Sequence, residues 1–129
     1  MRSSGLWHPR LSHLVAGLGH GELLVVADPG LPIPTHVETI DLVYTRGEPA
    51  FMPVLRTVLG ELVVERATLA EELADEKLVA DLTDALGPVP CERVTHEELK
   101  VRTARARVVV RTGEDTPYAN IVLRAGVAF

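Results

Sequence analysis

Short apolar runs rich in β-branched residues alternate along this chain with segments of helical periodicity, and glycine and proline residues separate them. The runs typical of strands are 22–28, 37–44, 89–94, 108–110 and a last one that begins at Ile121. The segments typical of helices are 11–18, 51–59, 78–86 and a helix that begins after Thr95. This alternation predicts an α/β fold with three layers, α/β/α, in which helices cover both faces of a mixed, mostly parallel sheet.

The first predicted helix and the segment that follows the second one carry further local signals. In the first helix Ser12 lies near the start, and Gly19 is expected to cap the end. The segment from 61 to 77 supports two interpretations, because residues 61–64 have an extended pattern whereas residues 66–77 are mostly helix formers. The residues alone leave both a strand and a helix open there.

The length of 129 residues, with 47% hydrophobic and 24% charged residues, predicts a single domain covering residues 1–129. The formal net charge of -5 disfavours nucleic acid as a partner, and the one basic run, Lys100 to Arg107, is typical of a solvated helix face. A single cysteine, Cys91, rules out a disulfide within the chain. The apolar runs fall far short of the roughly 18 residues that span a bilayer, so we expect a cytoplasmic protein without a membrane partner.

His20 is the strongest candidate for acid/base chemistry. It lies between Gly19 and Gly21, which leave the backbone free to adopt positive φ and the imidazole unshielded. Histidine changes its charge near neutral pH, as an acid/base catalyst must. Asp28 directly follows the apolar run 23–27, and the carboxyl ends of strands in α/β sheets are common ligand sites. His20 and Asp28 therefore flank one predicted strand.

The other candidates lie late in the chain. His96 opens a helix that starts with a capping box at Thr95, and Lys100 follows one turn later. Tyr118 and Asn120 carry hydrogen-bonding groups of the kind that orient a polyol. Both lie just before the last predicted strand.

Other chemistries have less support in the residues. We do not expect a metal site built from His20, Asp28, His96 and Glu22, because no two of them have a tight spacing such as i,i+4. The glycines around His20 precede a strand instead of following one, which does not match a phosphate-binding loop. No residue near Cys91 in the sequence would activate its thiol.

Several motifs, linked in a fixed order, carry a resemblance to a known family. They are Gly19-His20, Asp28-Pro-Gly-Leu-Pro-Ile-Pro34, Ile40-Asp41, Pro49-Ala-Phe51, His96-Glu-Glu-Leu-Lys100, Val110-Arg-Thr-Gly-Glu114, Pro117-Tyr-Ala-Asn-Ile121 and the final Ala125-Gly-Val-Ala-Phe129. Together they closely resemble the D-ribose pyranase and fucose mutarotase family, and its ribose pyranase branch in particular. The resemblance covers nearly all of the chain from residue 5 onward.

The resemblance implies an isomerase that converts the pyranose form of D-ribose into the furanose form without a cofactor or metal. It implies His20 as the catalytic acid, with a sugar site lined by Asp28, His96, Lys100, Tyr118, Ala119 and Asn120. It also implies a homo-oligomer, a ring-shaped decamer with sites between subunits, in which the segment 118–120 reaches a neighbour's His20. For the ambiguous segment it implies a strand from about 62 to 71.

The sequence departs from the family pattern beside the proposed site. His8 stands where asparagine is usual, Gly21-Glu22 replaces Thr-Asp, and Pro29 replaces alanine. Every proposed site residue is still present, and the departures touch the loop beside the site, where they bear on the preference for one sugar. A fucose-type mutarotase and a sugar-binding module without catalysis are therefore the alternatives.

Overall fold

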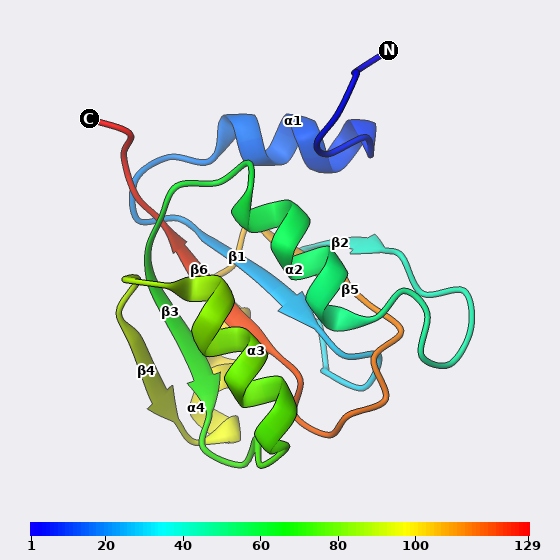
Figure 1. Ribbon diagram of the computed structural model, residues 1–129, viewed down its shortest axis with the longest axis vertical. Helices are drawn as coiled ribbons and strands as arrows, with labels where there is room; N and C mark the ends of the chain where they lie inside the picture. Colours follow the sequence, from blue (N-terminus) through cyan, green and yellow to red (C-terminus); the bar gives the residue numbers. More distant parts are fainter.

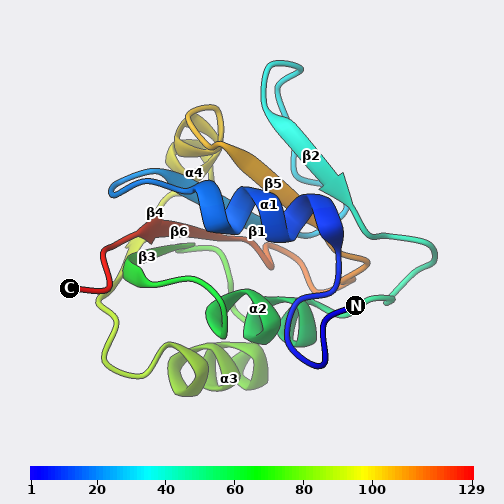
Figure 2. The same cartoon turned by 90° about the horizontal axis from the view of Figure 1, so that it is seen from above.

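The computed structural model describes residues 1–129 as one six-stranded sheet with helices on both faces (Figure 1). The strands are β1 (Leu23–Ala27), β2 (Glu38–Asp41), β3 (Val64–Ala70), β4 (Cys91–Val94), β5 (Val108–Arg111) and β6 (Ile121–Ala125). The helices are α1 (Pro9–Gly17), α2 (Phe51–Leu59), α3 (Glu76–Leu86) and α4 (His96–Thr103). Figure 2 shows α2 and α3 on one side of the sheet and α4 on the other, which confirms the predicted three layers. None of the four helices has the length and apolarity that a membrane crossing requires.

Only β6 runs against the direction of the other strands. The order across the sheet is β2-β5-β1-β6-β3-β4, and β6 pairs antiparallel with both of its neighbours. The remaining pairs, β1 with β5, β2 with β5 and β3 with β4, are parallel, so the predicted mixed, mostly parallel sheet is confirmed. The carboxyl ends of five strands and the start of β6 consequently lie together, and we call this side the carboxyl end of the sheet. The opposite side, where β1 starts and β6 ends, is the amino end.

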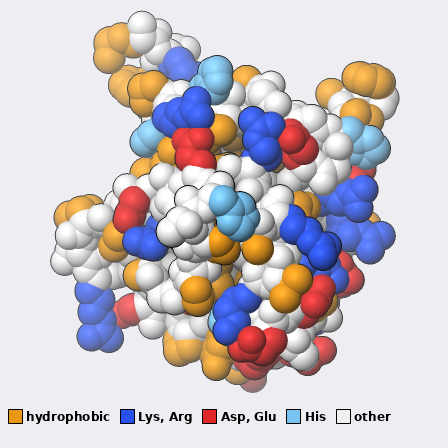
Figure 3. All heavy atoms as spheres, turned by 180° about the vertical axis from the view of Figure 1, so that it is seen from behind, with side chains coloured by type: hydrophobic (Ala, Val, Ile, Leu, Met, Phe, Trp, Pro, Cys, Tyr) orange, Lys and Arg blue, Asp and Glu red, His pale blue; other side chains and the backbone are white.

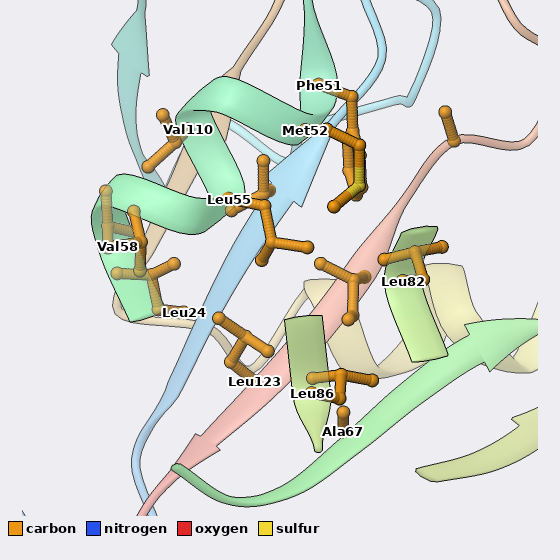
Figure 4. Close-up of a cluster of buried hydrophobic side chains, with 14 of the residues drawn as sticks. Leu24, Phe51, Met52, Leu55, Val58, Ala67, Leu82, Leu86, Val110 and Leu123 are labelled. Atoms are coloured by element: carbon orange, nitrogen blue, oxygen red, sulfur yellow. The ribbon is translucent and has the colours of Figure 1, made fainter. Parts of the chain in front are cut away.

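The larger core fills the space between the sheet and helices α1 to α3. Its fully buried members include Leu24, Phe51, Leu55, Val58, Val110 and Leu123 (Figure 4). Val25 points to the opposite face, into a smaller cluster with Leu99 of α4. Because both faces of β1 are buried, its sequence is continuously apolar instead of alternating.

The ambiguous segment contains a strand followed by a helix. β3 covers Val64–Ala70, and α3 begins at Glu76. The last four residues of β3 are buried between β6 and β4, and this burial outweighs their helix propensity. The carboxylate of Asp75 then accepts a hydrogen bond of 2.8 Å from a backbone N–H in the first turn of α3. The strand implied at 62–71 is confirmed with narrower bounds.

Helix α1 differs from its expected bounds at both ends. Nδ1 of His8 accepts a hydrogen bond of 3.1 Å from a backbone N–H in the first turn, so His8 caps the helix and Ser12 lies inside it. The helix ends at Gly17, and Leu18 is extended. The expectation that Gly19 caps this helix was wrong, because the chain has already turned toward β1 there.

Charges of both signs are interspersed on the face that carries α4 (Figure 3). Within the basic run, Lys100 pairs with Glu97 at 2.7 Å, and the guanidinium of Arg102 contacts a carboxylate of β4 at 2.5 Å. Arg107 pairs with Glu22 at 2.9 Å. The basic run therefore forms ion pairs with neighbouring acids instead of a continuous positive surface.

Candidate active site

Strand β1 separates the predicted site residues into two groups. His20 precedes β1 at the amino end of the sheet, and Asp28 follows it at the carboxyl end. The five residues of β1 alone span about 17 Å at the usual rise per residue. Within one chain, His20 and Asp28 therefore cannot both contact one monosaccharide.

Asp28 and Asn120 form a fixed pair at the carboxyl end. The antiparallel pairing of Val26 with Ile121 brings the end of β1 next to the start of β6. Oδ1 of Asn120 accepts the backbone N–H of Asp28 at 2.9 Å, and its Nδ2 donates to Oδ2 of Asp28 at 3.2 Å. The other carboxylate oxygen of Asp28 accepts two backbone N–H groups, each at 2.9 Å, from the loop that follows. The carboxylate is held in one orientation, and Oδ2 keeps one unused lone pair.

His96 and Tyr118 form the neighbouring wall. Their rings meet edge to face, with centroids 5.0 Å apart and planes at 75°. His96 lies in the first turn of α4, where the Glu72 carboxylate accepts its backbone N–H at 3.0 Å. Nδ1 of His96 is shielded from solvent and has no hydrogen-bond partner within the chain. A buried nitrogen without a partner is a group that a ligand can satisfy.

These residues surround a cavity of about 270 Å³, a size suited to a monosaccharide. It is lined by Asp28, Gly30, Leu31, His96, Pro117 and Tyr118. Ala119 is fully buried and links two of the predicted residues. Lys100 lies one turn along α4 from His96, outside this lining, and its ammonium binds Glu97. That hydrogen bond from Lys100 lowers the pKa of the Glu97 carboxyl.

His20 lies in a separate cluster at the amino end. Its Nε2 is 2.8 Å from Oε2 of Glu65, and Oε1 of the same carboxylate forms an ion pair with Nε of Arg124 at 2.7 Å. Gly21 has a φ of 84°, so the positive φ expected beside His20 is present on that side. No local pattern in the sequence indicates Glu65 or Arg124, because their contact depends on the pairing of β3 with β6.

The loop around His20 is closed by Glu22. Its carboxylate accepts the backbone N–H of Gly19 at 2.6 Å and binds the guanidinium of Arg107 at 2.9 Å. The hydrogen bond from Gly19, followed by that from Arg107, lowers the pKa of the Glu22 carboxyl. The imidazole of His20 thus projects from a loop that is tied at its base, with 57% of the side chain exposed.

A model of the RbsD / FucU transport protein family matches residues 1–128 of the chain. The chain belongs to this family. This confirms the family that the linked motifs indicated. Among its members, a D-ribose pyranase of Symbiobacterium thermophilum is 52% identical over 131 residues, and a D-ribose pyranase 2 of Streptomyces griseus is 50% identical over 130 residues. Both alignments cover 100% of this chain and 100% of the relative.

Solved structures of the RbsD / FucU family share the fold. Bacillus subtilis RbsD complexed with D-ribose has a TM-score of 0.95 at 38% sequence identity, and 100% of both chains is covered. A fucose mutarotase from Streptococcus pneumoniae, in complex with L-fucose, has a TM-score of 0.81 at 20% identity. That alignment covers 95% of this chain and 94% of the mutarotase, and at such low identity it shows the fold alone.

The departures from the family pattern fall at both ends of the sheet. His8 caps α1, whereas Gly21 and Glu22 form the loop beside His20 at the amino end. Pro29 is exposed and follows Asp28 at the carboxyl end.

Two other side chains with reactive groups, those of His36 and Cys91, do not line the cavity. His36 Nε2 is 2.8 Å from the carbonyl oxygen of Ala104. Partial burial raises the pKa of the Cys91 thiol, which keeps it in its less reactive form. No group of three or more His, Cys, Asp or Glu side chains is arranged to hold a metal ion.

Proposed function

We propose that this protein is an isomerase that interconverts the pyranose and furanose forms of D-ribose. Relatives named D-ribose pyranase match the whole chain at up to 52% identity, and the RbsD structure at a TM-score of 0.95 contains D-ribose. The observation that carries the proposal is the polar cavity at the carboxyl end, with its oriented Asp28 and unsatisfied His96.

Interconversion of the ring forms needs only proton transfers. The anomeric hydroxyl loses a proton and the ring oxygen gains one as the ring opens to the aldehyde, and closure on another hydroxyl reverses these steps. No electron leaves the sugar and no group is transferred. The proposal therefore assigns no cofactor and no metal to the reaction.

Each of the predicted substrate-binding residues in or beside the cavity has a proposed role in holding the sugar. The carboxylate of Asp28 accepts hydroxyl protons, and Asn120 holds that carboxylate in place. His96 binds a hydroxyl through its unpartnered Nδ1, and the ring of Tyr118 covers the sugar. Lys100 stabilises negative charge on the sugar oxygen, for which its ammonium turns from Glu97 toward the cavity. Buried Ala119 fixes the backbone between the last two polar residues.

We also propose that His20 acts as the catalytic acid in a site that a second copy of the chain completes. The separation of His20 from the Asp28 cavity supports this, because neither end of the sheet holds both groups. Such a contact joins different surfaces of the two copies, and repetition of it closes a ring. A ring-shaped decamer is the assembly we expect, and sedimentation equilibrium would then give ten times the mass of one chain.

The cytoplasm is the proposed location. The unpaired Cys91 is compatible with a reducing compartment, where a free thiol persists.

Saturation-transfer NMR on D-ribose tests the proposed activity. We expect faster exchange between the pyranose and furanose signals with the protein present, and loss of this acceleration in His20→Ala. Absence of acceleration at any protein concentration would refute an isomerase, and ribose binding without acceleration would instead indicate a sugar-binding module. L-Fucose measured in parallel separates the two sugar branches, and a larger acceleration with fucose would favour a mutarotase of that type.

A further inference from the structure

The imidazole of His20 contacts the carboxylate of Glu65, and Arg124 binds the same carboxylate. We propose that Glu65 is a positioning residue that fixes the tautomer of His20 and leaves Nδ1 as the ring nitrogen that exchanges protons with the sugar. The inference rests on the proposed isomerase function and assigns a role to a residue outside the sugar cavity.

The contact itself sets the tautomer. A carboxylate can only accept hydrogen bonds, so the 2.8 Å contact between Nε2 of His20 and Oε2 of Glu65 requires a proton on Nε2. A neutral imidazole with a proton on Nε2 has its lone pair on Nδ1. With Nε2 engaged, Nδ1 is the only ring nitrogen that can face a substrate.

Glu65 is placed by three independent constraints. The register between β3 and β6 shifts between Val64 and Arg66, which is an irregularity of the kind that re-aims a side chain. Nε of Arg124 binds the second carboxylate oxygen of Glu65 at 2.7 Å. A Cβ at Gly126 would lie 3.1 Å from the Cβ of Glu65, so a glycine leaves room for this strand to approach. The carboxylate is therefore fixed before any sugar binds.

The loop that carries His20 is tied to the same strands. Gly21 donates its backbone N–H to the carbonyl oxygen of Ala125 at 2.8 Å, and Gly126 donates to the carbonyl oxygen of Val63 at 2.9 Å. His20, Glu65 and Arg124 thus belong to one hydrogen-bonded unit at the amino end of the sheet. Glu65 contacts the imidazole of His20 and does not line the sugar cavity. Its removal should therefore slow the proton transfer more than it weakens the binding of the sugar.

The chemistry needs both charge states of the imidazole. Nδ1 takes the proton of the anomeric hydroxyl while the bond between C1 and the ring oxygen breaks, and the imidazolium returns that proton to the ring oxygen. The open aldehyde has the same atoms as the ring, and closure on another hydroxyl reverses the two transfers. Glu65 stabilises the imidazolium through Nε2–H while the positive charge exists.

Two measurements test the proposal. In protein labelled with ¹⁵N-histidine, two-bond ¹H–¹⁵N correlations of His20, assigned by comparison with His20→Gln, should show the proton of the neutral ring on Nε2. Glu65→Gln should reduce the exchange rate of ribose by about 10- to 100-fold and change its dissociation constant by less than about threefold. The glutamine amide can donate to Nε2, so the His20 signals should also move toward the Nδ1–H tautomer.

Glu38→Gln is the matched control. Glu38 and Glu65 are similarly exposed, at 36% and 34% of the side chain, and each binds an arginine at 2.7 Å. Glu38 starts β2, which β5, β1 and β6 separate from β3 and Glu65, and its carboxylate is bound by Arg10. This variant should therefore keep the rate and the tautomer of the unmodified protein.

The outcomes separate this proposal from the proposed function. An Nδ1–H tautomer in the unmodified protein would overturn the role of Glu65, even if Glu65→Gln failed to assemble. An unchanged rate in Glu65→Gln, with His20→Ala inactive, would overturn it while the isomerase function stood. If the unmodified protein did not accelerate exchange, the function would fail and the role of Glu65 with it.

Discussion

Tyr118 is the only residue other than glycine with a positive φ, at 61°. An L-residue in this region carries strain of about 1–3 kcal/mol, and such residues concentrate at functional sites. The strained backbone aims the Tyr118 ring at His96 beside the cavity. The strained backbone of Tyr118 therefore places its ring in the wall of the proposed sugar site.

Tyr118→Gly should separate stability from binding. Glycine relieves the strain but increases the entropy of the unfolded chain, so the free energy of unfolding should change by less than about 1 kcal/mol. The affinity for ribose should fall, because the ring that covers the cavity is gone. Urea denaturation and a ribose titration measure the two effects, with Tyr118→Phe as the variant that keeps the ring. A loss of several kcal/mol in stability would mean that the ring supports the fold.

The sequence singled out the separate candidate residues but not the side chains that they contact. His20, Asp28 and His96 could be found because their motifs and flanking glycines are local signals. Glu65 and Arg124 are 59 positions apart in the sequence and meet only because β3 pairs with β6. The residues of β3 left its secondary structure open, so their meeting could not be predicted.

At the scale of elements, helix α4 places His96. The hydroxyl of Thr95 accepts the backbone N–H of Glu98 at 3.2 Å, as the capping box predicted. His96 is the first residue of the helix, so its ring position depends on how this end is fixed. Asp75 caps α3 in the same way, but α3 lies on the other face of the sheet.

Thr95→Ala should reduce both stability and ribose affinity. The loss of the cap costs about 1 kcal/mol of unfolding free energy, and a frayed first turn displaces His96. Asp75→Ala should cost a similar amount and leave ribose affinity unchanged. Chemical denaturation and calorimetric titration of both variants provide the comparison. Equal ribose affinities in the two variants would show that the cap of α4 does not position the site.

The antiparallel direction of β6 is a feature of the sheet that the sequence did not predict. The strands and their apolar character follow from local patterns, as in Leu23–Ala27. The insertion of β6 between β1 and β3 depends on pairings between distant segments, and no local signal encodes them. Yet this insertion brings Tyr118 and Asn120 to the end of β1, so the cavity depends on it.

At the scale of the whole molecule, surface ion pairs link stability to pH. Hydrogen bonds lower the pKa of four glutamate carboxyls below the ordinary value of 4.5. The largest effect comes from Gly19 on Glu22, from Arg10 on Glu38, from Arg102 on Glu92 and from Lys100 on Glu97. A carboxyl with a lower pKa in the folded state stabilises the fold above its unfolded pKa, and the contribution disappears as the pH falls through the folded pKa.

We therefore expect stability to decline below about pH 4.5 and these groups to add no pH dependence near neutrality. Because the carboxyls are close to solvent, added salt should weaken the effect. Urea midpoints at pH 7 and pH 3.5, at low and high salt, measure both dependences. A midpoint that rises on acidification would contradict the assignment.

In the proposed assembly, each active site is built from the amino end of the sheet of one copy and the carboxyl end of the sheet of another. Complementation tests it directly. His20→Ala and Asp28→Asn should each lose about a hundredfold in exchange rate when alone. Assembled together from the unfolded state, they should regain up to about one quarter of the unmodified activity, because random mixing pairs an intact His20 with an intact Asp28 at that frequency. A mixed assembly that forms normally but stays as inactive as its parents would contradict a site shared between copies.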